Sequence, residues 1–428
     1  MKVYRYPGKK AWKRLLARPA LETKALDDIV LDIIEDIKLN GDEAVRKYTL
    51  KFDGVDISDA RISQEEQEEA LKNIDSKLKD AIKLAYDNIY RFHKEQVPEM
   101  MEIETVPGVK CWQKPIAIER VGLYVPGGTA PLFSSVLMLA VPATIAGCKE
   151  IVVCSPPNAD GKLHPAIIFA AQISGVKKIF KVGGVQAIAA MSFGTETIPA
   201  VYKIFGPGNQ YVTAAKQLVT RMGIAIDMPA GPSEVAVLAD EFSDTRFIAS
   251  DLLSQAEHGI DSQVILITTA ESIISEVQKE LERQLDSLPR KELAKESLIN
   301  SRIFLVKSKQ DMMELVNTYA PEHLIISTSD ADILAEQVIN AGSVFIGQYT
   351  PESAGDYVSG TNHTLPTHGY AKVYSGVNMD SYYKKITFQK ISKQGLEKIG
   401  PAIEIMADAE QLTAHSRAVS LRLAKNNK

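Results

Sequence analysis

The chain has 428 residues and a formal net charge of −5, with 45% hydrophobic and 24% charged residues. This length exceeds the roughly 250–300 residues at which one hydrophobic core stops growing, so we expect at least two domains. The composition is close to the globular average, which excludes collagen, coiled coil and wholesale disorder. The negative charge argues against nucleic acid as a partner. No apolar run reaches the roughly 18 residues of a membrane span, so we expect no membrane partner.

The first 21 residues form a basic arm that carries seven Lys and Arg side chains and no acidic one. No apolar stretch with a cleavage site follows these charges, so we expect neither secretion nor organelle import. Trp12, Leu15 and Leu16 have helical spacing, which indicates a short helix in the arm.

The chain has three cysteines, Cys111, Cys148 and Cys154, and none belongs to a CxxC pair. Their number and spacing give neither a disulfide framework nor a thiolate zinc site. We assign these cysteines no chemistry and expect a reducing, cytoplasmic compartment.

The first half of the chain passes from helices to alternating elements. Residues 22–100 have apolar positions at helical spacing, with Gly41 as a helix stop. Between 116 and 208, short β-branched runs alternate with helical stretches, which predicts βαβ units and a parallel sheet. The predicted strands span 116–125, 151–154, 179–182 and 202–205, and the helices between them include 136–147 and 165–174.

The alternation resumes after Ser233 and is lost after about residue 376, and a helix over 404–423 ends the chain. The predicted strands of this half span 234–238, 264–268, 302–306, 324–327 and 343–346. We therefore predict an α/β protein with two open Rossmann-like parallel-sheet domains, an N-terminal helical arm and a small C-terminal helical module. The boundaries are 1–21 for the arm, 22–115 with 234–375 for the first α/β domain, 116–233 for the second, and 376–428 for the C-terminal module.

Three glycine-rich turns each follow a predicted strand and precede a helix, where backbone N–H groups can face a phosphate. They are Tyr124-Val-Pro-Gly-Gly128, Val182-Gly-Gly184 and Gly206-Pro-Gly-Asn209. None is a GxGxxG or GxxxxGK motif, and each one alone is usually a plain tight turn. Because all three lie at strand ends of one predicted sheet, a nucleotide or phosphorylated ligand and plain turns both stay open.

Two short segments carry candidate ligands and bases. Gln255 and His258 are three residues apart, so on a helix they share one face and can converge on a metal ion, although a lone helical His is usually structural. The adjacent Glu322 and His323 can both transfer protons near neutral pH if buried neighbours shift their pKa values. The alternative is that both residues lie in a solvated turn and have no catalytic role.

The segment from Ser353 to Thr367 is long and polar and cannot drive folding by burial, so we interpret Asp356, Asn362 and His363 as part of a site loop. Glu410 and His415 in the C-terminal helix look, on their own, like surface residues. Four of the seven histidines fall within these clusters. Imidazoles with carboxylate or amide oxygens suit zinc or a similar divalent ion in a catalytic site.

Together these motifs resemble the histidinol dehydrogenase family, in the same order and over nearly the whole chain. The motifs that carry the resemblance are Tyr124–Gly128, Gly231-Pro-Ser-Glu-Val235, Ser254-Gln-Ala-Glu-His-Gly259 with Asp261-Ser-Gln263, Ala320-Pro-Glu-His-Leu324, and Gly355-Asp356 through Ser359-Gly-Thr-Asn-His363-Thr-Leu-Pro366.

The resemblance implies oxidation of L-histidinol through L-histidinaldehyde to L-histidine with reduction of two NAD⁺, the closing reactions of L-histidine biosynthesis. It implies one Zn²⁺ per subunit, bound by Gln255, His258, Asp356 and His415. The substrate contacts that it implies are the same four residues with Ser233, His323, His363 and Glu410. NAD contacts would come from Tyr124, Gln186 and Asn209.

The resemblance further implies a homodimer, with His415 and Glu410 supplied by the partner subunit through the module 376–428. It places the metal and catalytic clusters in the first α/β domain and NAD on the 116–233 domain. For the catalytic residues we expect His323 to be the base in both oxidations and Glu322 to activate the water that hydrates the aldehyde.

Two other functions remain as alternatives. A zinc-dependent amidohydrolase could use the same His, Asp and Glu-His groups to activate water, but would need no NAD. A dimeric metal-binding scaffold would leave Glu322 and His323 without a role. The lack of GxGxxG also predicts a weakly held, exchangeable NAD.

Overall fold

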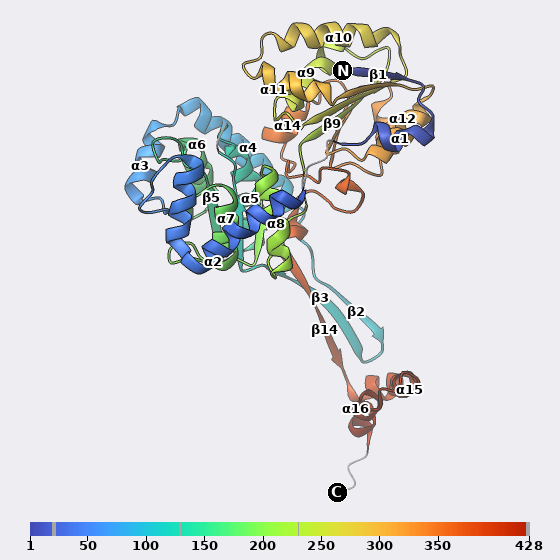
Figure 1. Cartoon of the computed structure of the whole chain (residues 1–428). Coiled ribbons are helices and arrows are strands. Elements are labelled where there is room, and N and C mark those ends of the chain that lie inside the picture. Colours follow the sequence, from blue (N-terminus) through green and yellow to red (C-terminus); the bar gives the residue numbers. More distant parts are fainter. Residues whose placement is uncertain (19–22, 128–129, 230, 425–428) are drawn as a thin grey trace.

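The computed structural model describes residues 1–18, 23–127, 130–229 and 231–424, and its two parallel sheets each carry helices on both faces (Figure 1). A β-ribbon extends from the sheets and ends in a pair of helices. The predicted α/β class, with two parallel-sheet units, an N-terminal helix and a C-terminal helical module, is confirmed. Among the described helices, none combines the length and the apolar character needed to cross a bilayer.

The five-stranded sheet has the order β6-β5-β4-β7-β8 and is parallel throughout. Its strands are β4 (Arg120–Tyr124), β5 (Glu150–Ser155), β6 (Lys178–Lys181), β7 (Lys203–Phe205) and β8 (Ala225–Ile226). Its crossover helices are α5 (Phe133–Ala146), α6 (Pro165–Ile173), α7 (Gly184–Phe193) and α8 (Gln210–Arg221). The chain adds strands outward from β4 and then returns to place β7 on its other side. The strand order therefore reverses between β4 and β7, the point at which open α/β sheets bind ligands.

The six-stranded sheet has the order β1-β11-β10-β9-β12-β13, again parallel, and reverses between β9 and β12. Its strands are β1 (Lys2–Arg5), β9 (Glu234–Ala239), β10 (Gln263–Thr268), β11 (Arg302–Leu305), β12 (His323–Ile326) and β13 (Ser343–Ile346). Its helices are α1 (Lys9–Leu15), α9 (Thr245–Ala256), α10 (Ser272–Leu285), α11 (Lys291–Ile299), α12 (Lys309–Tyr319), α13 (Ala331–Ala335) and α14 (Glu352–Tyr357). The central strands are buried on both faces, as helix layers on both sides require.

The N-terminal helices differ from the predicted domain assignment, because they cover the five-stranded sheet. They are α2 (Thr23–Asp53), which is kinked at Gly41, α3 (Gln64–Asn73) and α4 (Ser76–Lys94). Ile34 of α2 packs in one core with Phe180, and Ile89 of α4 packs with Leu137. Burying each such isoleucine contributes roughly 1.5–3 kcal/mol. Helical periodicity shows which face of a helix is apolar but not which sheet will cover it, so grouping 22–115 with 234–375 was wrong.

The arm 1–21 is not only helical. Lys2–Arg5 form β1, which pairs with β11 at the edge of the six-stranded sheet, and Trp12 and Leu15 of α1 enter that sheet's core. The predicted helix at Trp12 is therefore confirmed, and the arm is part of the six-stranded unit. Residues 19–21 lie outside the described residues.

The ribbon is an antiparallel sheet of order β14-β3-β2, formed by β2 (Met101–Val106), β3 (Val109–Ala117) and β14 (Tyr383–Ile391). The predicted strand 116–125 is thus two strands, since β3 joins the ribbon and β4 the parallel sheet. Short 3₁₀ helices, η1 (Tyr370–Lys372) and η2 (Met379–Tyr382), precede β14.

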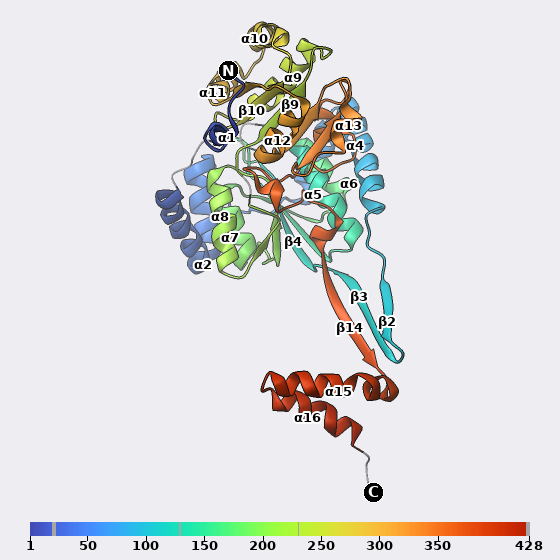
Figure 2. The same cartoon turned by 90° about the vertical axis from the view of Figure 1, so that its right-hand side faces the viewer.

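The C-terminal module is a helical hairpin of α15 (Lys393–Ala409) and α16 (Thr413–Leu423) rather than the single helix predicted over 404–423. The break falls at Gln411, whose φ of +59° is incompatible with a right-handed helix. The ribbon and the hairpin stand away from both parallel sheets (Figure 2).

Candidate functional site

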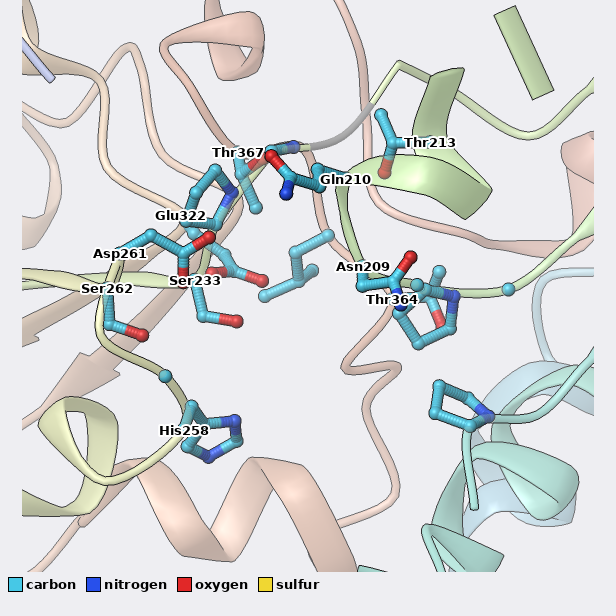
Figure 3. Close-up of a pocket in the computed structure, with 18 of the residues that line it drawn as sticks. Asn209, Gln210, Thr213, Ser233, His258, Asp261, Ser262, Glu322, Thr364 and Thr367 are labelled. Atoms are coloured by element: carbon cyan, nitrogen blue, oxygen red, sulfur yellow. The ribbon is translucent and has the colours of Figure 1, made fainter. Parts of the chain in front are cut away.

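A cavity of about 320 Å³ lies between the two parallel sheets, and Figure 3 shows side chains converging on it from opposite walls. One wall comes from the five-stranded unit and includes Asn209 and Gln210. The other comes from the six-stranded unit and includes Ser233, His258 and Glu322. Neither unit alone encloses this space.

The two sheets present opposite ends to the cavity. Asn209 follows β7, so the five-stranded sheet contributes the carboxyl ends of its strands, as parallel sheets usually do. Ser233 and Glu322 immediately precede β9 and β12, so the six-stranded sheet contributes amino ends.

Glu322 and His323 are both buried, which excludes the solvated turn considered as their alternative. Glu322 Oε2 accepts the Glu234 N–H at 2.8 Å. His323 Nδ1 lies 3.1 Å from the Glu234 carbonyl oxygen, so Nδ1 carries the proton and donates it. His323 Nε2 is buried with no hydrogen-bond partner among the described residues, and it lies 3.7 Å from Asp356 Oδ1. Nε2 is therefore the ring nitrogen that can act as a base when it carries no proton.

The electrostatic setting shifts both groups. Burial raises the pKa of Glu322 to about 7, against the opposing effect of the His323 charge. Burial lowers the pKa of His323, but the carboxylates of Glu352 and Glu322 outweigh it and raise that pKa to about 10. Both groups therefore hold protons more strongly than they would in water, and Glu322 changes charge close to neutral pH.

A group able to hold a metal ion lies beside this pair. One potential ligand atom each from His258, Glu352 and Asp356 falls within 4.8 Å of the others. Burial lowers the pKa of His258, which keeps the imidazole neutral and free to coordinate. The structure thus brings the predicted His258 and Asp356 together and adds Glu352, which the sequence analysis did not single out.

Gln255 and His258 do not share one helical face. Helix α9 ends at Ala256, so Gln255 is in its last turn and His258 is in the turn that follows. The hydrogen bonds of the buried Gln255 amide are satisfied when its oxygen shares the Glu234 N–H with Glu322 Oε2, at 2.9 Å, and its nitrogen contacts Glu352 Oε1.

The predicted site loop is helical in its first part. Asp356 lies on α14, which begins directly after Pro351, a residue suited to a helix start. His363 Nδ1 lies 2.8 Å from the Asp356 carbonyl oxygen, and its Nε2 is 3.2 Å from Ser135 Oγ of α5. Burial lowers the pKa of His363, so a neutral imidazole bridges the two sheet units.

Asn362, in contrast, has a structural contact. It is buried and donates to the Met138 carbonyl oxygen at 2.6 Å, which secures the loop to α5. The interpretation of Asn362 as a site group therefore does not hold.

The three predicted NAD contacts lie at the carboxyl end of the five-stranded sheet. Asn209 lines the cavity and caps α8 by accepting the N–H groups of Tyr211 and Val212. The Tyr124 hydroxyl accepts the Gly184 N–H at 3.2 Å, and burial raises the pKa of Tyr124 to about 12, so it stays a phenol.

Gln186 Nε2 donates to Asp53 Oδ2 at 3.4 Å, while its buried Oε1 has no partner among the described residues. Asp53, the last residue of α2, was not anticipated, because nothing in the helical pattern of α2 distinguishes it from a surface carboxylate. Gly128 of the first glycine turn lies outside the described residues.

Glu410 and His415 do not reach the cavity of their own chain. Both are exposed, at the junction of α15 and α16 and on α16, in the hairpin that the ribbon carries away from the sheets (Figure 2). Of the predicted zinc ligands, one chain therefore brings His258 and Asp356 together, holds Gln255 against their neighbour Glu352, and carries His415 away on the hairpin (Figure 2).

Comparisons with known proteins identify relatives of the whole chain. The family model of histidinol dehydrogenase matches residues 16–423. The chain is 60% identical to a histidinol dehydrogenase of Bacteroides thetaiotaomicron over 99% of both chains, and 49% identical to that of Escherichia coli K12 over 96% of this chain and 94% of the other. It is also similar to the crystal structure of histidinol dehydrogenase from Elizabethkingia anophelis, with 51% identity and a TM-score of 0.97, covering 100% of this chain and 99% of that one.

Proposed function

Because this chain belongs to the histidinol dehydrogenase family, we propose that it oxidises L-histidinol through L-histidinaldehyde to L-histidine and reduces two NAD⁺. The observation that carries the proposal is the buried Glu322–His323 pair, whose free Nε2 faces Asp356 beside a cavity between two Rossmann-like units. One cavity is thus bordered by a base and by a group that can bind a metal ion. It also lies at the point where the strand order of the five-stranded sheet reverses, a position suited to a dinucleotide.

The donor set fits zinc. Gln255, His258 and Asp356, with His415 of the partner subunit, supply imidazole, carboxylate and amide donors, and no thiolate, as in open catalytic zinc sites. When bound, Zn²⁺ would hold the imidazole and amino nitrogens of histidinol and so orient the carbinol carbon. Glu352 contacts Gln255 and lies within reach of His258 and Asp356, so its carboxylate could serve as a further metal ligand.

His323 serves as the base in both oxidations. Its Nδ1–H is held by the Glu234 carbonyl oxygen, so Nε2 is the atom that accepts the alcohol proton as hydride passes to NAD⁺. The carboxylates that raise its pKa include Asp356, and a divalent cation held there would oppose this effect and release Nε2 for proton transfer.

Glu322 serves the second oxidation. Its pKa of about 7 lets it remove a proton from the water that adds to the aldehyde. His323, once it has passed the alcohol proton to solvent, takes the proton of the hydrate as the second hydride passes to a second NAD⁺. Substrate contacts would come from Ser233 and His363 of one subunit and from Glu410 of the partner subunit. A homodimer that closes the site in this way would keep the aldehyde bound between the two steps.

NAD⁺ would bind on the opposite wall, at Tyr124, Gln186 and Asn209. The missing GxGxxG motif supports an exchangeable cofactor, which suits an enzyme that uses two NAD⁺ per turnover. The three free cysteines support a reducing compartment, the cytoplasm.

The test is NADH formation from L-histidinol and NAD⁺, with histidine counted in parallel, before and after metal removal by a chelator. Two NADH per histidine, lost on chelation and restored by zinc, is the expected result. Metal-bound protein that forms no NADH would favour the amidohydrolase instead. Unchanged behaviour of Glu322→Gln and His323→Asn variants would favour a metal-binding scaffold.

A further inference from the structure

The catalytic pair is held by the backbone of one residue, Glu234. Its N–H donates to Glu322 Oε2 at 2.8 Å, and its carbonyl oxygen accepts from His323 Nδ1 at 3.1 Å. Glu234 is the first residue of β9, and β12 begins at His323 beside it. Any shift of Glu234 would therefore move the acceptor that sets the His323 tautomer and the donor that fixes the Glu322 carboxylate.

The side chain of Glu234 is in turn secured by Arg18 of the N-terminal arm. Arg18 Nη2 donates to Oε2 at 2.7 Å and Arg18 Nε contacts Oε1, which makes a two-point ion pair. The Glu234 side chain is 2% exposed and that of Arg18 13% exposed, so this pair is largely shielded from water. Oε1 also accepts the His368 N–H at 2.8 Å.

Arg18 also binds the turn between α12 and β12, which leads into the catalytic pair. Its Nη2 donates to the carbonyl oxygens of Tyr319 at 2.9 Å and Ala320 at 3.3 Å. The guanidinium carbon lies 4.1 Å from the centre of the Tyr319 ring. Ala320 has a φ of +55°, a left-handed conformation that a residue with a Cβ keeps only when its surroundings hold it. Glu322 follows two residues later.

We propose that Arg18 is a positioning residue, which clamps the start of β9 at Glu234 to the turn before β12 and so holds Glu322 and His323 in place for proton transfer. The inference rests on the proposed roles of Glu322 and His323. A buried carboxylate that loses its countercharge is destabilised, so without Arg18 the Glu234 side chain would move toward water. The β9 start then loses the contact that fixes it, although Arg18 does not line the cavity.

The test compares full-length, zinc-loaded Arg18→Ala, Arg18→Lys and Glu234→Gln with the wild type. Arg5→Ala is the matched control, because Arg5 lies in the same arm and its ion pair with Glu271 is exposed. We expect kcat to fall by about 10- to 100-fold in Arg18→Ala, with little change in KM for either substrate and with zinc content retained. Arg18→Lys should recover little, because an ammonium cannot make the two-point contact.

Methylguanidinium added to Arg18→Ala should restore part of kcat in a saturable manner, an effect that a merely structural role would not produce. Folded Arg18→Ala and Glu234→Gln with wild-type kcat would overturn the proposal. So would a kcat loss that follows zinc loss or unfolding and is not rescued by methylguanidinium. If Arg18→Ala does not fold, the same kcat and KM comparison in Glu234→Gln, which preserves shape, decides the question.

A readout independent of turnover separates this proposal from the proposed function. In ¹⁵N-histidine-labelled protein the His323 signals, assigned with His323→Asn, should report a single ring environment with Nδ1 protonated and hydrogen-bonded in the wild type, and a mixture of ring environments in Arg18→Ala. A wild type that oxidises no histidinol would defeat the proposed function alone. An unchanged His323 signal in Arg18→Ala would defeat the clamp alone.

Discussion

Glu322, His323, Glu352 and Asp356 place three carboxylates around one imidazole in a largely buried pocket. Burial raises the pKa of Glu322 while the carboxylates raise that of His323, so proton affinities near the cavity differ from those in water. Such perturbed groups mark functional sites, because general acids and bases need pKa values near the working pH.

Glu322→Gln should separate the two oxidations. The amide cannot remove a proton from water, so oxidation of supplied L-histidinaldehyde should fall by about 10²–10⁴-fold, while the first hydride transfer from histidinol largely remains. Rapid-quench measurement should then find NADH and aldehyde formed together, with little histidine. His323→Asn is the matched control and should lose both oxidations. Equal losses of both steps in Glu322→Gln would contradict the assigned role.

Asp53 gives a prediction on stability and pH. Burial raises its pKa from 3.8 to about 6, so the folded protein favours the protonated form, and this stabilising contribution is lost as the pH rises through 6. Asp53→Asn should therefore resist urea better than the wild type at pH 8, and the difference should shrink as the pH falls toward 4. A less stable Asp53→Asn at pH 8 would refute this.

Asp56→Asn is the control of opposite sign. Its hydrogen bond and ion pair with Arg46 lower the pKa of Asp56, so that contribution is present above the unfolded pKa and is lost as the pH falls. Without NAD⁺ at pH 8, the urea midpoint of Asp53→Asn should lie above that of the wild type and the midpoint of Asp56→Asn below it. The deficit of Asp56→Asn should persist down to pH 4, because its contribution is lost only as the pH falls below the unfolded pKa.

Among the connecting elements, the turn from β7 to α8 is the most constrained. Gly206 has a φ of +124°, and a Cβ added there would lie 2.0 Å from the Tyr124 carbonyl oxygen. The close approach joins the ends of β4 and β7, where the strand order reverses and Asn209 reaches the cavity. Glycine is required there by both its conformation and its lack of a side chain.

Gly206→Ala should destabilise the protein by about 2–4 kcal/mol and raise KM for NAD⁺ more than KM for histidinol, because the turn must move away from Tyr124. Gly223→Ala is the matched control. Gly223 has a φ of +97° but nothing within 4 Å of an added Cβ, so only the backbone penalty of about 1–2 kcal/mol applies. Urea unfolding and steady-state kinetics measure both effects. Equal changes in the two variants would show that the contact with Tyr124 does not matter.

The outline of the molecule bears on the proposed homodimer. The ribbon carries α15 and α16, with exposed Ile405, Met406 and Leu421, away from both sheets (Figure 2). A hairpin of this kind buries little of its own apolar surface, which a second copy of the chain would cover. If that copy supplies His415 and Glu410, the site exists only in the dimer.

Hybrid dimers test this arrangement. In co-expressed Glu322→Gln and His415→Asn subunits, a hybrid has one site with both defects and one with none. Random pairing should then return about a quarter of the wild-type activity, although each variant alone is nearly inactive. The control pair, Glu322→Gln with His258→Asn, should recover no activity, because each substitution inactivates the cavity of the chain that carries it. No recovery in the first pair would mean that each chain uses its own His415.

Local patterns in the sequence predicted the α/β class, the parallel strands and the polar clusters at Gln255, His258, Glu322, His323 and Asp356, because periodicity and turn chemistry act over a few residues. Contacts between distant segments had no such local signal. They include the packing of α2–α4 on the five-stranded sheet, the entry of β1 into the other sheet, Glu352 beside His258, and the hold of Arg18 on Glu234. Each depends on which apolar faces and which buried charges meet after folding, and these partners are separated along the chain by 48 residues for Ile89 and Leu137 and by up to 300 residues for Lys2 and Arg302.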